Sequence, residues 1–308
     1  TAADLSGTLV LSDKPVAVFA GSECGNIPND MKCEQGSCRG SGLSCNEDWD
    51  CPIPCCCDHL EEQLLPVTSL GDHYVAARSQ PRNGEEDYWR ILAIEDGTEI
   101  TTTPPVAQIP TLSEGEFYEF GVDKSFEIHA NNPVMVGQFL AGQNAPVSNV
   151  SECVGGGGGS LGKCKYNPAV DCLYHDECML YCITEAECEA YGHHLDAGIG
   201  DPSFILLIPV SRFRTEYVFL IPDKYALDYV NIVLLAGAKL YIDGDEVDPS
   251  VYEMVGTGEF RLARSMISDG VHHLTSNRPM GITVYGYDNA VSYGYPAGMT
   301  VNTLTGSR

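Results

Sequence analysis

An acidic loop, DGDEVD at residues 243–248, is the best candidate in the sequence for ligand chemistry. Asp243, Asp245 and Asp248 offer carboxylate oxygens at a spacing that resembles a calcium loop. An EF-hand would place a bidentate glutamate at the twelfth position, where this chain has Met254. The alternative is an Asp-Gly turn that joins two strands. The sequence therefore predicts a possible Ca²⁺ site at these three aspartates and no other cofactor.

Cysteines form the second candidate group, and their number indicates the compartment. The chain has 14, in two groups that are both even in number. Spacings such as Cys51 to Cys55 could suggest zinc, but neither group shows the paired C-x2-C pattern of structural zinc sites. We therefore predict disulfides that are local to each group, in an oxidising, extracellular or cell-surface location. The predicted disulfide residues are Cys24, Cys33, Cys38, Cys45, Cys51, Cys55, Cys56 and Cys57, and Cys153, Cys164, Cys172, Cys178, Cys182 and Cys188.

Catalytic motifs are weak. Residues 158–162, GGSLG, match the G-x-S-x-G nucleophile elbow, but a glycine tract stands where the elbow needs a strand. His272 and His273 are adjacent, so on a strand they face opposite ways and cannot chelate one ion together. No acid–base constellation with a nucleophile is visible, and we predict no catalytic residue and no enzyme. Asn149 begins a glycosylation sequon, which matters only in a eukaryotic host.

Composition excludes several partners. The chain has 308 residues, a net charge of -26 and a pI near 4.4. Such a surface repels nucleic acid and anionic lipid. No run approaches the roughly 18 apolar residues of a membrane span, so no membrane insertion is expected.

The elements that position these groups follow an internal repeat. Residues 4–21, 125–142 and 270–286 align on Pro15, Pro133 and Pro279. Apolar residues alternate with polar ones on both sides of each proline, which predicts a strand, a tight turn and a second strand. The sequence therefore predicts three hairpins of one design.

Further landmarks recur in the same order. A proline is followed eight residues later by Tyr74 and by Tyr217, and a Gly-Glu-Phe triplet follows at residues 115–117 and 258–260. We expect an all-β, antiparallel fold of internally repeated sandwich-like units, with a propeller as the alternative. The expected division is 1–124 with a disulfide-rich insert at 22–59, 125–267 with a second insert at 143–202, and 268–308 as closing hairpin and C-terminal strand.

The first hairpin lacks the Gly-Glu-Phe strand that precedes the other two. An unpaired edge would invite another strand. The tail, residues 299–304, alternates apolar and polar residues and could fill the gap in the same molecule or in a neighbour, giving an oligomer or a head-to-tail fibre. Alternatively, the chain is part of a longer protein and the missing strand lies upstream.

Four segments in one order resemble a known family: residues 4–21, 57–75, 88–101 and 284–298. They are similar to the N-terminal domain of IgG Fc-binding protein and its bacterial relatives. The resemblance implies an extracellular location and carries no catalytic residues. Together with the residues it indicates a non-catalytic secreted or cell-surface module for adhesion, matrix or extracellular fibre assembly, with a protein or glycan ligand. The alternative is a secreted carbohydrate-binding or hydrolytic protein that uses the loops around Asp243.

Overall fold

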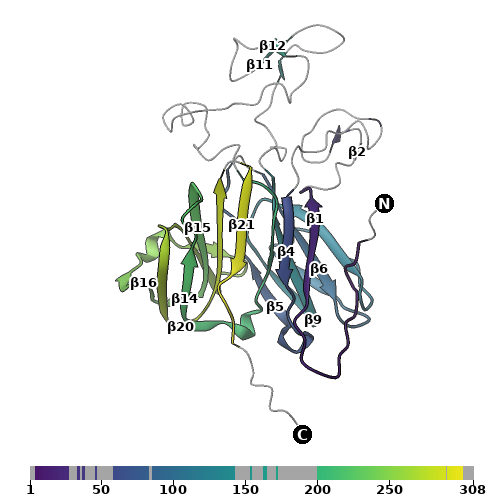
Figure 1. The fold of residues 1–308 in the computed structure, drawn as a ribbon, viewed down its shortest axis with the longest axis horizontal. Helices are drawn as coiled ribbons and strands as arrows, with labels where there is room; N and C mark the ends of the chain where they lie inside the picture. Colours follow the sequence, from purple (N-terminus) through teal and green to yellow (C-terminus); the bar gives the residue numbers. More distant parts are fainter. Residues whose placement is uncertain are drawn as a thin grey trace.

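The computed structural model describes residues 4–27, 33–34, 37–38, 46, 58–82, 85–142, 153–154, 162–164, 171–172, 200–288 and 290–300. In this part of the chain the regular elements are antiparallel strands and three-residue 3₁₀ helices, so the all-β prediction is confirmed. Within the same residues, no helix is long and apolar enough to cross a membrane. Figure 1 shows two β units side by side.

The first unit is a six-stranded sheet around one long strand. Strand β9 pairs with β5, β6, β7 and β13, and β6 pairs with β8. The bounds are β5 (Gly71–Ala76), β6 (Asp87–Ala93), β7 (Ile100–Thr103), β8 (Phe117–Val122), β9 (Phe126–Leu140) and β13 (Ser203–Leu206). The sheet therefore groups β9 with the strands before it, although the sequence division falls at residue 125.

The second unit is an eight-stranded sheet around β20, a strand of 19 residues. Strand β20 pairs with β14, β15, β16 and β21, while β17 extends β16, and β19 and β18 extend β15. The bounds are β14 (Arg214–Ile221), β15 (Leu227–Leu235), β16 (Leu240–Ile242), β17 (Asp245–Glu246), β18 (Glu253–Val255), β19 (Phe260–Met266), β20 (Gly270–Asp288) and β21 (Val291–Pro296). Sheets of this size around a shared strand fit sandwich-like units better than four-stranded propeller blades.

Shorter elements complete the described chain. A two-stranded ribbon is formed by β1 (Phe19–Gly25) and β4 (Asp58–Gln63). The inserts contain β2 (Cys33–Glu34), β3 (Ser37–Cys38), β10 (Cys153–Val154), β11 (Gly162–Cys164) and β12 (Asp171–Cys172). The 3₁₀ helices are η2 (Val67–Ser69), η4 (Val210–Arg212) and η5 (Pro249–Val251).

The two units repeat one cross-strand register, which confirms the internal repeat. The equivalent pairs are Tyr74–Ile128 and Tyr217–Leu274, Ile91–Val136 and Ile232–Ile282, and Ile100–Ala130 and Leu240–Ser276. In each unit a buried tyrosine hydroxyl donates to the carbonyl of the residue after the aligned proline. Tyr74 Oη lies 2.6 Å from Val134 O, and Tyr217 Oη lies 2.8 Å from Met280 O.

The predicted hairpins at residues 125–142 and 270–286 are wrong, because each stretch is one long, bent strand. The first half of β9 pairs with β5 and β7, and the second half pairs with β6 and β13. Phe126 and Val134, from the two halves, meet in one core cluster, so the halves lie in facing layers. At each bend an asparagine amide oxygen accepts a backbone N–H, at 2.8 Å in both Asn131 and Asn277.

The first hairpin, residues 4–21, is also absent. Its second part forms β1, and the register of Phe19 with Gln63 repeats that of Gly137 with Leu206. Its first part forms no strand, and Leu11 is 83% exposed. The described chain supplies no β5-like partner for this part, which explains why it is left unpaired.

The β1–β4 ribbon covers the outer face of the first sheet, as Figure 1 shows. Ile27 and Leu60 pack there against Tyr88 and Phe139. In the same way, β9 and β13 pack against the second unit, where Leu140 and Ile205 contact three tyrosines, Tyr229, Tyr285 and Tyr287. The β1–β4 ribbon therefore packs on unit one in the way that β9 and β13 of unit one pack on unit two.

The interface between the units also contains apolar and polar contacts. Val75 and Ala77 of unit one are buried against β15, β18 and β19. The segment that follows is held by polar groups: Asn231 Nδ2 donates to Arg78 O at 2.8 Å, and Gln80 N donates to Tyr285 Oη at 2.8 Å. Buried apolar area and satisfied polar groups together fix one arrangement of the units.

The second insert leaves the fold at a closed neck, because Leu140 of β9 faces Ser203 of β13. We expect that replacing residues 143–199 by a short Gly-Ser linker leaves one cooperative unfolding transition. The sequence predicts that disulfides local to the insert hold it, so the free energy of unfolding of the β units should change by no more than about 1 kcal/mol. Calorimetry measures this, with replacement of residues 28–57 as the matched case. Loss of the cooperative transition in either variant would contradict independent inserts.

The repeat aligns Glu62 of β4 with Ile205 of β13, which is fully buried. Burial raises the pKa of Glu62 to about 7, against hydrogen bonds from Gln63 and Leu206 that lower it. A carboxyl with a raised pKa in the fold binds more protons than in the unfolded chain, so stability falls as pH rises from about 4.5 to about 7.

We therefore expect Glu62→Gln to be more stable than wild type above pH 7, by on the order of 1 kcal/mol after solvent screening, and equal to it near pH 4. Urea unfolding at both pH values measures the difference. Glu61→Gln, at an exposed neighbouring position, is the control and should show no such dependence. Equal stability of E62Q and wild type from pH 4 to 8 would show that burial of the ionised Glu62 carboxylate costs nothing.

Candidate functional site

His73, Glu127 and His129 form a compact cluster on the face of unit one that meets unit two. The local structure places them there directly. Glu127 and His129 are two residues apart on β9 and so share one face, and His73 of β5 lies opposite His129 in the strand register. The opposite face of these strands, with Tyr74 and Ile128, fills the core.

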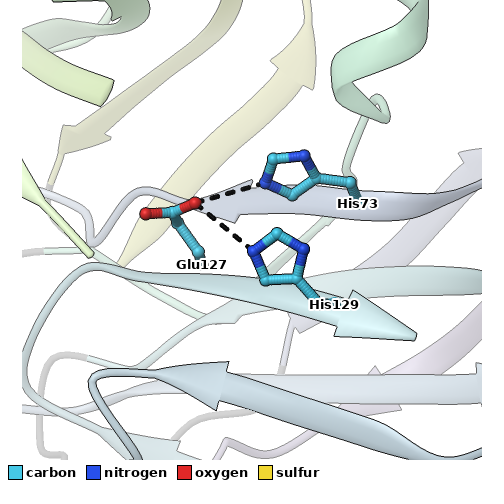
Figure 2. A group of neighbouring side chains, drawn as sticks. All are labelled: His73, Glu127 and His129. Carbon is cyan, nitrogen blue, oxygen red and sulfur yellow. Dashed lines mark hydrogen bonds and ion pairs between the residues drawn. The ribbon is translucent and has the colours of Figure 1, made fainter. Parts of the chain in front are cut away.

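The nitrogen and oxygen atoms of the cluster converge on one point (Figure 2). His73 Nε2 and His129 Nε2 lie 3.3 and 3.4 Å from the same atom, Glu127 Oε2. The two imidazole rings stack with their centroids 4.0 Å apart. The ligand atoms of all three residues lie within 4.8 Å of one another, which makes this cluster, in the described part of the chain, a group that could hold a metal ion.

The other carboxylate oxygen of Glu127 is held by unit two. Thr257 donates to Oε1 from its backbone nitrogen at 2.7 Å and from its hydroxyl at 3.0 Å. Burial alone would raise the pKa of Glu127, but the hydrogen bonds from Thr257 and His73 lower it overall. The side chain is 1% exposed, so a buried carboxylate anion joins the two units.

The surroundings of His73 favour its neutral form. Burial lowers the pKa of His73, and the neighbouring His129 lowers it further, against an opposing effect of Glu127. The ring edge of Phe260 from unit two contacts His73, with centroids 5.5 Å apart. A neutral imidazole has a lone pair available for a metal or a proton.

The equivalent positions of unit two hold a different set: Glu216, His273 and Thr275. His273 Nε2 lies 2.7 Å from Glu216 Oε1, and both side chains are about half exposed or more, at 49% and 63%. Threonine stands in place of the second histidine, so this set has two strong ligands and unit one has three.

Two of the three candidate calcium aspartates, Asp243 and Asp248, accept hydrogen bonds from protein groups. Asp243 Oδ2 lies 2.6 Å from His272 Nδ1, and Asp243 Oδ1 accepts the His273 backbone N–H at 2.8 Å. The His273 N–H, followed by His272, lowers the pKa of Asp243. Asp248 caps η5 by accepting from Ser250 N, and Asp245 lies in β17. Calcium binding at these residues stays a prediction.

His272 and His273 do point to different partners, Asp243 and Glu216, as their adjacency on a strand requires. Cys24 is disulfide-bonded. The pairing of the cysteines in the inserts, the glycosylation sequon at Asn149 and the GGSLG motif at residues 158–162 lie outside the described side chains.

Sequence reasoning missed the cluster because its two parts stand 54 residues apart. One signal was present: Glu127-x-His129 is a same-face pair on a strand that the repeat had already identified. The pairing of the Tyr74 strand with this strand is seen only in the structure. Only the register shows that His73 rather than Asp72 completes the group.

Gly256 tests the contact between Glu127 and unit two. Its φ is +53°, and a β-carbon built there would stand 2.0 Å from Glu127 Oε1. We expect Gly256→Ala to lower the free energy of unfolding by at least about 2 kcal/mol more than Gly237→Ala, because the buried carboxylate loses its hydrogen bonds. At Gly237, φ is +78° and a built β-carbon would have no atom within 4 Å, so Gly237→Ala introduces backbone strain without a steric clash. Urea unfolding that gives equal losses for both variants would show that the contact contributes nothing.

Comparison with known proteins gives a family and little else. Similar solved structures include an anti-sigma factor domain-containing protein from Clostridium clariflavum, at 13% identity, covering 75% of this chain and 84% of that one with a TM-score of 0.19. The apo form of Pleurotus ostreatus lectin has 9% identity, covers 75% and 76%, and has a TM-score of 0.20. TM-scores of this size carry no argument about fold or function. No curated protein matches the chain.

The family model described as IgGFc binding protein matches residues 1–286. This range spans the first unit and the second unit up to Gly286, two residues before the end of β20, and it includes His73, Glu127 and His129. The family resemblance read from the sequence is therefore confirmed, and the chain belongs to the IgGFc-binding protein family.

Proposed function

We propose that this chain is a non-catalytic extracellular module that acts through protein contacts between repeat units, in adhesion, matrix or fibre assembly. Membership of the IgGFc-binding family supports an extracellular binding module in general terms. The particular mode of contact rests on the repeat. One observation carries it: a surface that is buried between the two units is exposed at the end of the second unit.

Equivalent residues of the two units differ sharply in exposure. Val75 of β5 is 6% exposed, while Val218, its equivalent in β14, is 64% exposed. Ala77 is 6% exposed, while its equivalent, Leu220, is 58% exposed. Val75 and Ala77 are buried because unit two packs on them. No described residue plays that part for unit two.

The exposed residues form a connected patch on one sheet face. Leu220 faces Val271 across the β14–β20 register, and Val271 is 69% exposed. Large side chains exposed together on one face are typical of an interaction site. β14 also pairs on one side only, with β20, in the described sheet. We name this surface, made of Val218, Leu220 and Val271, the terminal patch.

The partner that fits the terminal patch is another repeat unit, supplied by a second copy of the chain. Val75 of unit one packs against a surface of unit two that includes Val233 and Phe260. The equivalent residues of unit one, Leu92 and Phe117, lie opposite each other on β6 and β8 and are only partly buried.

Residues 4–7 lie along this second surface and limit access to it. Arg90 bonds Asp4 and Ser6, and it stacks over Phe117 at 4.3 Å. Gly7 is in close contact with Gly115. Head-to-tail association through the two surfaces would be heterologous, the kind of contact that builds open fibres.

We expect the purified chain to associate with rising concentration, and Val218→Asp with Leu220→Lys to abolish this, because charges replace the apolar contact. Deleting residues 1–11 should strengthen association by uncovering Leu92 and Phe117. Light scattering after size exclusion measures the mass. Runs at about 0.1 and 1 M salt show whether the charge of -26 opposes assembly, since the Debye length falls from about 10 to about 3 Å.

Exposed Val251, on η5 and away from the terminal patch, supplies the control variant Val251→Asp. A wild-type chain and a 1–11 deletion that both stay monomeric at every concentration and salt would overturn self-association. Association that survives the double substitution would place the contact elsewhere.

A further inference from the structure

We propose that His73, Glu127 and His129 bind one Zn²⁺ ion, which fastens the junction between the two units. This site is independent of the terminal patch and of self-association. Imidazole nitrogens and a carboxylate oxygen are ligands that zinc prefers, and two histidines with one glutamate are an established zinc ligand set.

The distances between the donor atoms also suit a bound metal ion. Zinc bonds of about 2.0–2.1 Å in tetrahedral geometry separate neighbouring ligand atoms by about 3.3–3.4 Å. The two Nε2 atoms lie 3.3 and 3.4 Å from Glu127 Oε2. A hydrogen bond from an imidazole to a carboxylate would instead be near 2.8 Å, as it is between His273 and Glu216 at 2.7 Å. The two nitrogen–oxygen distances of the first-unit cluster thus match the spacing of neighbouring ligands around a zinc ion, and all three ligand atoms lie within 4.8 Å of one another.

The exposure of the three side chains suits an ion that enters from solvent. Glu127 is 1% exposed, His73 25% and His129 45%, so the carboxylate is buried and the histidines are partly open to solvent. Three protein ligands leave a fourth tetrahedral position on the open side, where water can bind.

The surroundings hold the glutamate in place, as an outer shell does in known metal sites. Thr257 bonds the Glu127 oxygen that faces away from the histidines, through both its N–H and its hydroxyl. Since Thr257 belongs to unit two and all three ligands to unit one, zinc would orient the carboxylate that the second unit binds. Metal binding and docking of the units should therefore support each other.

The repeat supplies a matched control. Unit two has Glu216, His273 and Thr275 at the same positions, with one histidine fewer. His273→Ala removes an exposed histidine of unit two, at the position that the repeat aligns with Glu127, and leaves the proposed site unchanged. His129→Ala is the main test variant, because its exposure makes a folding defect improbable; His73→Ala is the second.

The experiment uses the full chain with disulfides intact, free thiols alkylated and metals removed by a chelating resin. Zn²⁺ alone is titrated by calorimetry, and bound metal is counted by mass spectrometry after dialysis. Co²⁺ is then substituted, since its visible d–d bands report tetrahedral coordination. We expect one zinc per chain in wild type and in His273→Ala, a loss of more than about tenfold in affinity in His129→Ala and His73→Ala, and a rise in melting temperature with zinc only in the first two proteins.

Two results would overturn the proposal. The first is a wild-type chain that retains no zinc and gives no tetrahedral cobalt spectrum. The second is zinc binding of unchanged affinity in both His129→Ala and His73→Ala, which would place the ion on other residues.

Discussion

A strand that serves both layers of its unit is the constraint on which the rest of this structure depends. β9 and β20 each pair with one set of strands before their central bend and with another set after it. A proline at the bend lacks a backbone N–H, so it is tolerated where the strand passes between layers. Asn131 and Asn277 bind the neighbouring backbone at the same point. Because one chain segment joins the layers, the strand register on one side of the bend is coupled to the register on the other side.

Stacking of the units follows from that geometry. Side chains of β5 that point away from the core of unit one meet unit two, so this face of unit one is buried by its neighbour. The β1–β4 ribbon serves that role toward unit one, although only part of a unit is present there. At the other end, Val218 and Leu220 remain exposed at the positions where Val75 and Ala77 are buried. In repeat proteins each unit packs only on its neighbours, so a terminal unit has one outer face that no unit covers.

The buried carboxylate of Glu127 takes part both in the packing of the two units and in the histidine cluster. Glu127 has each oxygen committed to a different unit, Oε2 toward two histidines and Oε1 toward Thr257. A buried anion is costly unless it is fully paired, and this one is. At the equivalent positions of the second unit, Glu216 and His273 form an exposed pair instead. The buried carboxylate is therefore a feature of the junction, where it takes part in the docking of the units and in the cluster of donor atoms.

The sequence by itself determined the strands, the repeat and the family, because period-two alternation and repeated landmarks are local properties that need no knowledge of partners. It could not distinguish a hairpin from a bent strand at Pro133, since both show alternation on either side of a break and differ only in which strands they pair with. The acidic loop at Asp243 could be recognised from the sequence because its three candidate ligands lie within six residues. The cluster of His73, Glu127 and His129 was not, because strand register and the docking of a second unit decide which distant side chains converge and which carboxylate is buried.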